Sequence, residues 1–356
     1  MENHIVASFG PNDEYTRHSE GAFLRLKDGR ILFVYSRFRD SDSDDAPSDL
    51  VKMYSSDEGE TWTEPVITIA AAQFKTHNLM SVSLMRMAND DIGLFFIEKI
   101  EDMPVSHIWI ARSDDEGESW YKYTQCSLKD REGYYVLNND RIERLSSGRL
   151  LMPLGFHRGG YNSKTNNYFF GTGEVCFLYS DDDGETWAES PDTVCKPFTG
   201  TRTGLQEPGV FELKDGLIWA YARTDKMYQY EFFSFDGGLH WTSAQPSRFT
   251  SPDSPMKIAR NPYNDDLVSV WNPVPNYNGR KRSPAGWGRT PFVYAISKDN
   301  GATWSEPYII EDDPENGYCY PAVFFTKDGS MLVAYCSGGP KDHICLARLS
   351  IQKIVL

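Results

Sequence analysis

Two residues of opposite charge flank one hairpin near the middle of the chain, within the stretch from Leu205 to Trp241. Glu207 lies in the segment QEPGVFEL, and Arg223 follows sixteen residues later in AYARTD. A carboxyl group can transfer protons during catalysis, and a guanidinium group can bind an anion through two parallel N–H donors. Other hairpins of similar sequence lack this pair. Glu207 and Arg223 are therefore the first candidates for a functional site.

The hairpin belongs to a pattern that recurs along the whole chain. Five turns resemble Ser-x-Asp-x-Gly-x-(Thr/Ser)-Trp, and their tryptophans are 58, 67, 54 and 63 residues apart. Six apolar strand–turn–strand segments are interleaved with these turns, and each period has room for four short strands. The five tryptophans are Trp62, Trp120, Trp187, Trp241 and Trp304.

The residues that recur in these turns have a structural role. In each turn we expect the aspartate to accept hydrogen bonds from turn amides, the glycine to adopt a positive φ and the tryptophan to pack against a sheet. An aspartate that recurs once per module is a scaffold residue rather than a catalytic one. The aspartates assigned to the scaffold are Asp57, Asp115, Asp182, Asp236 and Asp299.

Six hairpins and five turns predict an all-β fold, namely a six-bladed β-propeller of four-stranded antiparallel blades. We expect a single domain over residues 1–356. One blade lacks the tryptophan turn, so the two chain ends are expected to meet there. The segment HICLARLSI and the segment near IVASFG would complete one shared sheet, which leaves no free edge.

The composition argues against some classes of binding partner. The chain has 36 Lys and Arg against 51 Asp and Glu, a formal charge of −15, which argues against nucleic acid or an anionic membrane as the main partner. The six cysteines form no CxxC pair and predict buried thiols rather than a metal site. No apolar run approaches the roughly twenty residues of a membrane span. MENHIVASFG lacks signal-peptide features, so a native start at residue 1 predicts a cytoplasmic protein and a trimmed start a secreted one.

These turns and hairpins resemble the Asp-box, or BNR, repeats of the sialidase (neuraminidase) superfamily, over essentially the whole chain. The repeat indicates the fold more than the function, because propellers that are not sialidases carry it too. The resemblance implies an exo-acting, retaining glycosidase that removes a terminal sialic acid, a sugar whose anomeric carbon bears a carboxylate. It implies neither a metal nor an organic cofactor.

The catalytic residues of that superfamily can be placed one at a time. The resemblance implies Glu207 as the base that activates a tyrosine nucleophile. In GYCYPAVFFTKDG this is Tyr320, with Tyr318 as the alternative. The acid is expected in the loop SRFRDSDSDDAPSDL, where Asp45 precedes Ala-Pro as in some bacterial sialidases. The other aspartates of this loop, at positions 40, 42, 44 and 49, remain alternatives.

A cluster of arginines is expected to bind the substrate carboxylate. The three are Arg17, Arg223 and Arg289. Arg289 lies in GWGRTPFVYAIS, and its competitors in the same loop are Arg280, Lys281 and Arg282. Arg17 lies in YTRHSEGAFLRLKDG, which lacks the Ile and Pro of the family's Arg-Ile-Pro motif and needs about two extra residues to align. Arg37 resembles the arginine that neighbours the first of the three.

Further polar residues could bind the hydroxyl groups of the sugar. Asn139 and Asp140 precede a strand in YYVLNNDRIERL and His157 follows it, positions that tend to face a propeller's mouth, although an Asn-Asn-Asp run also suits a turn. The second repeat lacks the family's Asp-Pro segment, so a related nonulosonic acid or another acidic sugar stays open. Two rival functions remain. One is a hydrolase or lyase for uronate-type glycans that uses His18, His77 and His157, and the other is a non-catalytic propeller that binds glycan or protein. The oligomeric state is open.

Overall fold

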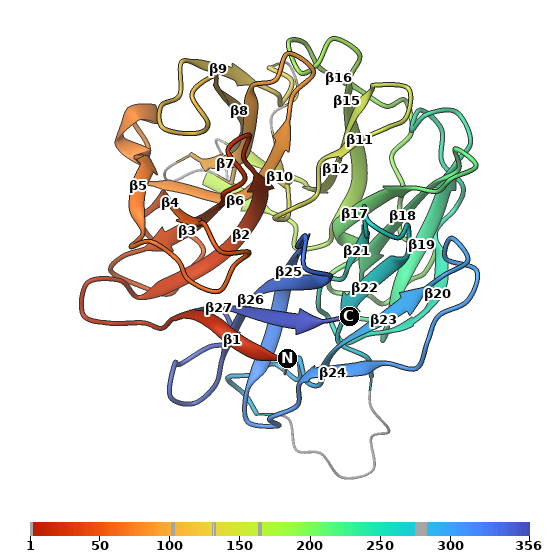
Figure 1. Cartoon of the computed structure of the whole chain (residues 1–356). Helices are drawn as coiled ribbons and strands as arrows, with labels where there is room; N and C mark the ends of the chain where they lie inside the picture. The colour runs from red at the N-terminus through yellow and green to blue at the C-terminus, as the bar shows by residue number, and fades with distance from the viewer. Residues whose placement is uncertain (1–2, 101–103, 130, 132, 163–165, 275–282) are drawn as a thin grey trace.

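The β-sheets of the protein, seen in a computed structural model, are arranged around a common centre (Figure 1). The structure describes residues 3–100, 104–129, 131, 133–162, 166–274 and 283–356. Arg280, Lys281 and Arg282 lie outside the described residues. The one helix in the described part of the chain is a 3₁₀ turn, η1 (Ala71–Phe74). No helix in that part is long and apolar enough to cross a membrane.

The strands follow the chain from sheet to sheet. The largest sheet contains β2 (Arg17–Arg25), β3 (Ile31–Phe38), β4 (Ser48–Ser55), β5 (Val66–Ile69), β6 (Asn78–Arg86), β7 (Ile92–Lys99), β8 (Ser106–Ser113) and β9 (Lys122–Gln125). The next contains β10 (Tyr134–Val136), β11 (Glu143–Arg144), β12 (Leu150–His157), β15 (Glu174–Ser180) and β16 (Ala188–Glu189), with a separate hairpin of β13 (Gly159–Asn162) and β14 (Asn166–Phe169).

Three further sheets have four strands each. The first contains β17 (Gln206–Glu212), β18 (Ile218–Arg223), β19 (Tyr228–Ser234) and β20 (Gln245–Thr250). The second contains β21 (Lys257–Arg260), β22 (Leu267–Trp271), β23 (Phe292–Ser297) and β24 (Tyr308–Glu311). The third contains β25 (Gly317–Phe325), β26 (Ser330–Gly338), β27 (Arg348–Val355) and β1 (His4–Phe9).

The expectation of six separate four-stranded blades is met only in part. The largest sheet consists of two antiparallel groups, β2–β5 and β6–β9, joined among the described residues by one parallel pair of Ser48 with Asn78. The Asn78 side chain also donates a hydrogen bond to the Ala46 carbonyl at 2.6 Å. The turn that enters β4 therefore draws the two groups into one sheet. The all-β propeller class itself agrees with the structure.

The hydrophobic core lies between neighbouring groups of strands. Phe177 of β15 packs against Phe232 of β19, for example, and Leu332 of β26 shares a buried cluster with Phe33 of β3. Burying each large apolar side chain contributes about 1.5–3 kcal/mol. Because the cluster between β26 and β3 joins the last group to the first, the packing closes on itself around the centre.

The Ser-x-Asp-x-Gly turns are built as the sequence predicts. In one of them Asp182 Oδ1 accepts a hydrogen bond from the Thr186 amide at 2.9 Å, and Gly184 has a φ of 86°. Trp187 donates from Nε1 to the Gly184 carbonyl and packs against Phe95. The repeated aspartates are therefore occupied in holding turns.

The chain ends meet in one sheet, which confirms that expectation. β1 pairs antiparallel with β27, with Phe9 opposite Leu349. All six cysteines are free and five of them are buried, as expected for scattered thiols.

Candidate active site

A recurring irregularity of the inner strands directs side chains toward the centre of the propeller. The pairing register of β2, β6, β17 and β25 shifts near the start of each strand. In each case a residue at the shift has a positive φ, namely Glu20 (54°), Ser81 (58°), Glu207 (46°) and Tyr320 (56°). Such a conformation costs of order 1–3 kcal/mol for residues other than glycine, and it persists mainly where a site needs it. A bulge of this kind re-aims the side chain it carries.

All four of these residues line one cavity of about 880 Å³, the central cavity. Further polar lining residues come from neighbouring strands and loops: Asp44, Asp45, His77, Lys99, Asn138, His157, Gln206 and Arg223. One wall is aromatic, because the Phe169 ring stacks on His157 with centroids 5.3 Å apart and meets Tyr134 edge-on. Phe169 lines the cavity, and 51% of the residue is exposed. A cavity of this volume is typical of small-molecule binding sites.

Tyr320 and Glu207 meet at the floor of the central cavity. The Tyr320 hydroxyl donates a hydrogen bond to Glu207 Oε1 at 2.8 Å, and both residues are 8% exposed. Burial and the nearby Glu207 carboxylate raise the pKa of Tyr320 well above its ordinary value. Tyr320 therefore keeps its proton at neutral pH. Tyr318 instead packs in the core against Phe292 and does not line the cavity among the described residues.

Arg223 lies beside this pair. Its Nη1 forms an ion pair with Glu207 Oε2 at 2.8 Å, and its Nε lies 3.1 Å from Asp253 Oδ1. Its Nη2 donates to Gln206 Oε1 at 2.9 Å. The pairing of Gln206 with Arg223 across β17 and β18 places both ends of the hairpin at the cavity.

Arg289 approaches the same place from the loop before β23. It donates two hydrogen bonds to the Asp253 carbonyl, and its guanidinium lies 5.5 Å from the Tyr320 ring centroid. Its Nη1 is buried and has no hydrogen-bond partner in the described part of the chain. Asp253 thus links Arg289 to Arg223, and one donor of Arg289 remains unused next to Tyr320.

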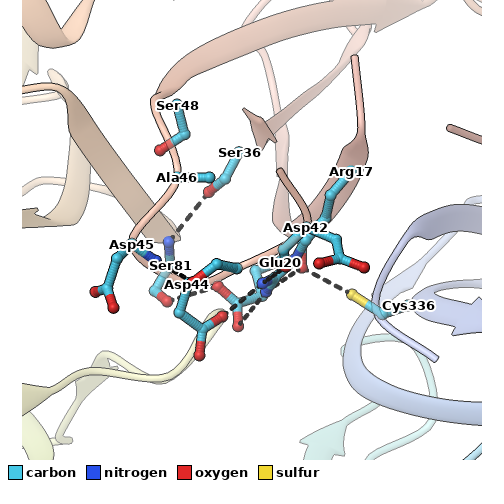
Figure 2. Close-up of polar contacts among 12 residues, drawn as sticks. Arg17, Glu20, Ser36, Asp42, Asp44, Asp45, Ala46, Ser48, Ser81 and Cys336 are labelled. Carbon is cyan, nitrogen blue, oxygen red and sulfur yellow. Dashed lines mark hydrogen bonds and ion pairs between the residues drawn. The ribbon is translucent and has the colours of Figure 1, made fainter. Parts of the chain in front are cut away.

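Asp45 lies at the cavity rim, in the loop between β3 and β4. Its side chain is 83% exposed and forms an ion pair with Lys99 Nζ at 3.0 Å. His77 Nε2 contacts the Asp45 carbonyl at 3.0 Å. The neighbouring Asp44 also lines the cavity but points toward Arg17, away from Asp45 (Figure 2).

Arg17 is fully buried, and its guanidinium group is bound by neighbouring side chains. Its Nη1 pairs with Asp44 Oδ1 at 2.5 Å, and its Nη2 donates to Ser19 Oγ at 3.1 Å. Desolvation raises the pKa of the Asp44 carboxyl, although 58% of its side chain is exposed, but Arg17 and Lys99 outweigh this and lower that pKa to about 2. Among the described residues that line the cavity, neither Arg17 nor Arg289 appears.

Glu20 is the second carboxyl group at the floor of the cavity. Ser81 donates a hydrogen bond to Glu20 Oε2 at 2.7 Å, and Arg17 Nη2 lies 3.8 Å from Oε1. Burial raises the pKa of Glu20 to about 7, against the opposing effect of Arg17. Glu20 therefore changes its charge near neutral pH.

Three expected binding residues lie elsewhere. Arg37 stacks over the Tyr15 ring at 3.9 Å and does not line the cavity as the described residues form it. Asn139 donates to the backbone carbonyls of Gly21 and Tyr320, so its amide holds inner strands together. Asp140, also with a positive φ of 56°, forms an ion pair with Lys257 at 3.0 Å.

The three histidines considered for a uronate-directed enzyme are divided by the structure. His77 and His157 line the cavity. His18 stacks on Phe9 and contacts the Tyr35 hydroxyl instead. Burial lowers the pKa of His157, which keeps its imidazole neutral at pH 7.

Several lining residues were not anticipated from the sequence. Lys99 and Gln206 are the main polar ones, and Tyr134 and Phe169 the aromatic ones. A signal for Lys99 did exist. It ends the second strand of its hairpin, β7, as Arg223 ends β18. For Phe169 there was none, because the β13–β14 hairpin departs from the repeat.

Comparison with known proteins agrees with this fold. The family model of the BNR repeat-like domain matches residues 38–333. A protein named anhydrosialidase from Macrobdella decora is 26% identical over 264 residues, which cover 69% of this chain and 31% of the relative. A protein named sialidase from Bacteroides fragilis (strain YCH46) is 24% identical over 393 residues, which cover 99% of this chain and 67% of the relative. The chain thus spans about a third of the first relative and two thirds of the second.

A solved structure shares the architecture. The leech intramolecular trans-sialidase in complex with 2,7-anhydro-Neu5Ac superposes with a TM-score of 0.70 at 15% identity, covering 100% of this chain and 70% of that one. At this identity the likeness concerns the fold. The family match, by contrast, covers most of the sequence. The chain belongs to the BNR repeat-like domain family, within the superfamily of sialidase and BNR-repeat propellers.

Proposed function

We propose that the protein is a retaining, exo-acting glycosidase that removes a terminal sialic acid or a related nonulosonic acid from glycans. The observation that carries the proposal is the hydrogen bond from Tyr320 to Glu207 at 2.8 Å on the floor of the central cavity. A buried tyrosine paired with a buried carboxylate is the arrangement of a tyrosine nucleophile and its base. The sialidase-named relatives support this class of enzyme. Because their identity to the chain is low, the sugar has to be determined by experiment.

In the first step Tyr320 transfers its phenolic proton to Glu207 while its oxygen bonds to the anomeric carbon. The glycosidic bond breaks, and the departing oxygen takes a proton from the carboxylic acid form of Asp45 at the cavity rim, which would have left its ion pair with Lys99. A neutral nucleophile suits a substrate whose anomeric carbon bears a carboxylate, because an anion would be repelled. The ion pair of Arg223 with Glu207 orients the base for this transfer.

In the second step water replaces the tyrosine. Asp45, now a carboxylate, accepts a proton from the attacking water, and the bond from Tyr320 to the sugar breaks. Tyr320 recovers its proton from Glu207. Two displacements at one carbon return the original anomeric configuration.

The substrate carboxylate would bind between Arg223 and Arg289. Arg223 lines the cavity, and Arg289 has an unused buried Nη1 next to Tyr320. Guanidinium groups suit this role because they offer paired donors to a carboxylate. Both side chains are already fixed through Asp253, so little order is lost on binding.

The test is hydrolysis of an aryl sialoside by the wild type and by the Tyr320→Phe and Glu207→Gln variants. We expect kcat to fall by roughly 100-fold or more in both variants, because the nucleophile or its base is lost. The matched control is Tyr318→Phe, the same substitution two residues away on β25 in the core. Its kcat should stay close to that of the wild type. Wild-type kcat in the Tyr320→Phe variant would exclude the proposed site.

A second candidate is a lyase that acts on uronate-type glycans. The observation in its favour is the neutral imidazole of His157 in the cavity wall, which could remove a proton next to a carboxylate. This reaction forms an unsaturated sugar that absorbs ultraviolet light. Incubating the wild type with uronate glycans and with sialosides, and following this absorbance, separates the two candidates.

A further inference from the structure

The loop of residues 40–46, here called the acid loop, is held in place by side chains that contact its backbone carbonyl groups. Four side chains from surrounding segments donate to, or contact, carbonyl groups of the acid loop. The contacts are Arg17 Nη1 to Asp42 (3.3 Å), Asn78 Nδ2 to Asp44 (3.0 Å) and to Ala46 (2.6 Å), Lys99 Nζ to Asp44 (2.7 Å), and His77 Nε2 to Asp45 (3.0 Å). These contacts fix the position of the acid loop at the cavity rim.

The two adjacent carboxylates of the acid loop have different partners. Asp44 points at Arg17, whereas Asp45 points away from it (Figure 2). Asp45 forms an ion pair with Lys99. Asp44 cannot supply a proton near neutral pH, because Arg17 and Lys99 hold its carboxyl ionised. The loop therefore presents one fixed anion to Arg17 and leaves Asp45 for the substrate.

Arg17 has little to offer a substrate while Asp44 is in place. Its Nη1 is used by Asp44 and by the Asp42 carbonyl, and its Nη2 by Ser19. Its guanidinium also lies 4.5 Å from the Phe38 ring centroid, and the residue is 0% exposed. Its Nε has no hydrogen-bond partner among the described residues, but it is buried. The charge of Arg17 is paired with the Asp44 carboxylate, whereas Arg289 donates to the Asp253 backbone carbonyl. A substrate would have to displace Asp44 to reach Arg17.

Displacing Asp44 would also move Asp45, since the two residues are adjacent. A substrate bound to Arg17 would thus pull the acid away from the glycosidic oxygen, and an acid must lie within hydrogen-bond reach of the atom that it protonates. Carboxylate binding by Arg17 and protonation by Asp45 therefore exclude each other in this arrangement.

We propose that Arg17 is a positioning residue, which anchors the acid loop through Asp44 and so holds Asp45 at the leaving-group side of the cavity. The substrate carboxylate is then bound by Arg223 and Arg289 without Arg17. This inference rests on the proposed glycosidase function. It gives Arg17 a different task from the carboxylate binding expected from the sequence.

The test compares two substrates that differ in their need for an acid. An aryl sialoside with an activated leaving group departs with little protonation, whereas a sialoside linked to another sugar needs the acid. The variant Asp44→Asn removes the charge of the anchor and keeps its shape. We expect its kcat/KM on the sugar-linked substrate, which reports the first step alone, to fall on the order of 100-fold, the effect of a small misplacement of a catalytic group. On the aryl substrate kcat/KM should stay within about threefold of the wild type, because proton donation matters little in that step.

The variant Arg17→Met should show the same selective loss if it folds, and Arg17→Met combined with Asp44→Asn should lose no more than either alone. Asp40→Asn is the matched control, because Asp40 is an exposed aspartate of the same loop. Its kcat on both substrates should stay at the wild-type value.

Two outcomes would overturn the inference. One is an Asp44→Asn variant with unchanged or lower KM and unchanged kcat on both substrates, which is expected if Asp44 merely blocks a binding arginine. The other is an equal loss of kcat/KM on both substrates. Failure of the proposed function looks different, because the wild type itself would then turn over neither substrate.

Discussion

At the scale of single residues, Glu20 couples the site to pH. It is buried at the floor of the cavity beside Arg17 and Ser81, and burial raises its pKa from 4.5 to about 7. The folded protein therefore binds a proton at Glu20 between these pH values, whereas the unfolded chain does not. By linkage, this residue makes the folded state less stable as the pH rises from about 4.5 to about 7, with no further change above.

The variant Glu20→Gln should remove this dependence, because glutamine does not titrate. As the pH rises from about 4.5 to 7, its free energy of unfolding should fall by about 3 kcal/mol less than that of the wild type. Urea unfolding at a series of pH values measures this difference. Glu306→Gln on the exposed surface serves as the control, and its curve should run parallel to the wild type. A parallel curve for Glu20→Gln would show that Glu20 does not titrate near neutral pH.

At the scale of elements, the bulges in the inner strands connect backbone strain to function. In β17 the bulge places Glu207, and the chain returns to regular pairing at Gly209 opposite Tyr221. A Cβ on Gly209 would lie 2.4 Å from the Tyr221 ring. The Tyr221 hydroxyl in turn accepts hydrogen bonds from Arg141 and from the Ile258 amide. The ring thus has partners on two neighbouring elements and little freedom to move.

Gly209→Ala should therefore push β17 away from β18 and displace Glu207. We expect a loss of about 1–3 kcal/mol in the free energy of unfolding, typical of overpacking, together with a clear loss of kcat. Gly216→Ala is the comparison. Gly216 has a φ of 80° with open space around it, so its substitution should cost about 1–2 kcal/mol of stability and leave kcat unchanged. Chemical denaturation and the aryl sialoside assay measure both quantities. Full activity in Gly209→Ala would show that the bulge in β17 does not determine the position of Glu207.

At the scale of the whole molecule, the pairing of β1 with β27 closes the ring of sheets. Val6, Ala7 and Phe9 of β1 pack against the buried cluster that joins the last group of strands to the first. Removing β1 would expose this cluster and leave the edge of β27 unpaired, and an unpaired edge invites association with other chains.

Deleting residues 1–10 should accordingly lower the melting temperature and produce oligomers. The loss in the free energy of unfolding should be on the order of several kcal/mol, the contribution of the apolar side chains removed. Thermal unfolding and size-exclusion chromatography follow the two effects. Deleting residues 1–3 alone, ahead of β1, should change neither, and a monomeric, equally stable form of the longer deletion would contradict the argument.

Much of this architecture was predictable because it repeats. The turn motif indicates its own hydrogen bonds, as Asp182 and Trp187 show, and the missing turn indicates where the ends meet. Tyr320 and Glu207 were expected together because of the resemblance to the sialidase superfamily, and the structure brings their side chains into contact.

The remainder depends on features without a local signature. The sequence does not reveal that the backbone of Glu20 adopts a positive φ, because this glutamate has no distinguishing neighbour pattern. The path of the acid loop, rather than its composition, decides that Asp44 meets Arg17 while Asp45 meets Lys99. The side of a strand that Arg37 faces depends on its stacking over Tyr15, which lies outside the repeat.

The pairing of β1 with β27 also determines when the molecule can be finished during its synthesis. Ser8 lies opposite Ser350, 342 residues later in the chain. At ribosomal rates of about 5–20 residues per second, β1 waits roughly 20 to 70 seconds for its partner strand. During that interval its apolar side chains and backbone groups are open to other nascent chains on the same message. β1 thus stays without its partner strand until β27 has been synthesised.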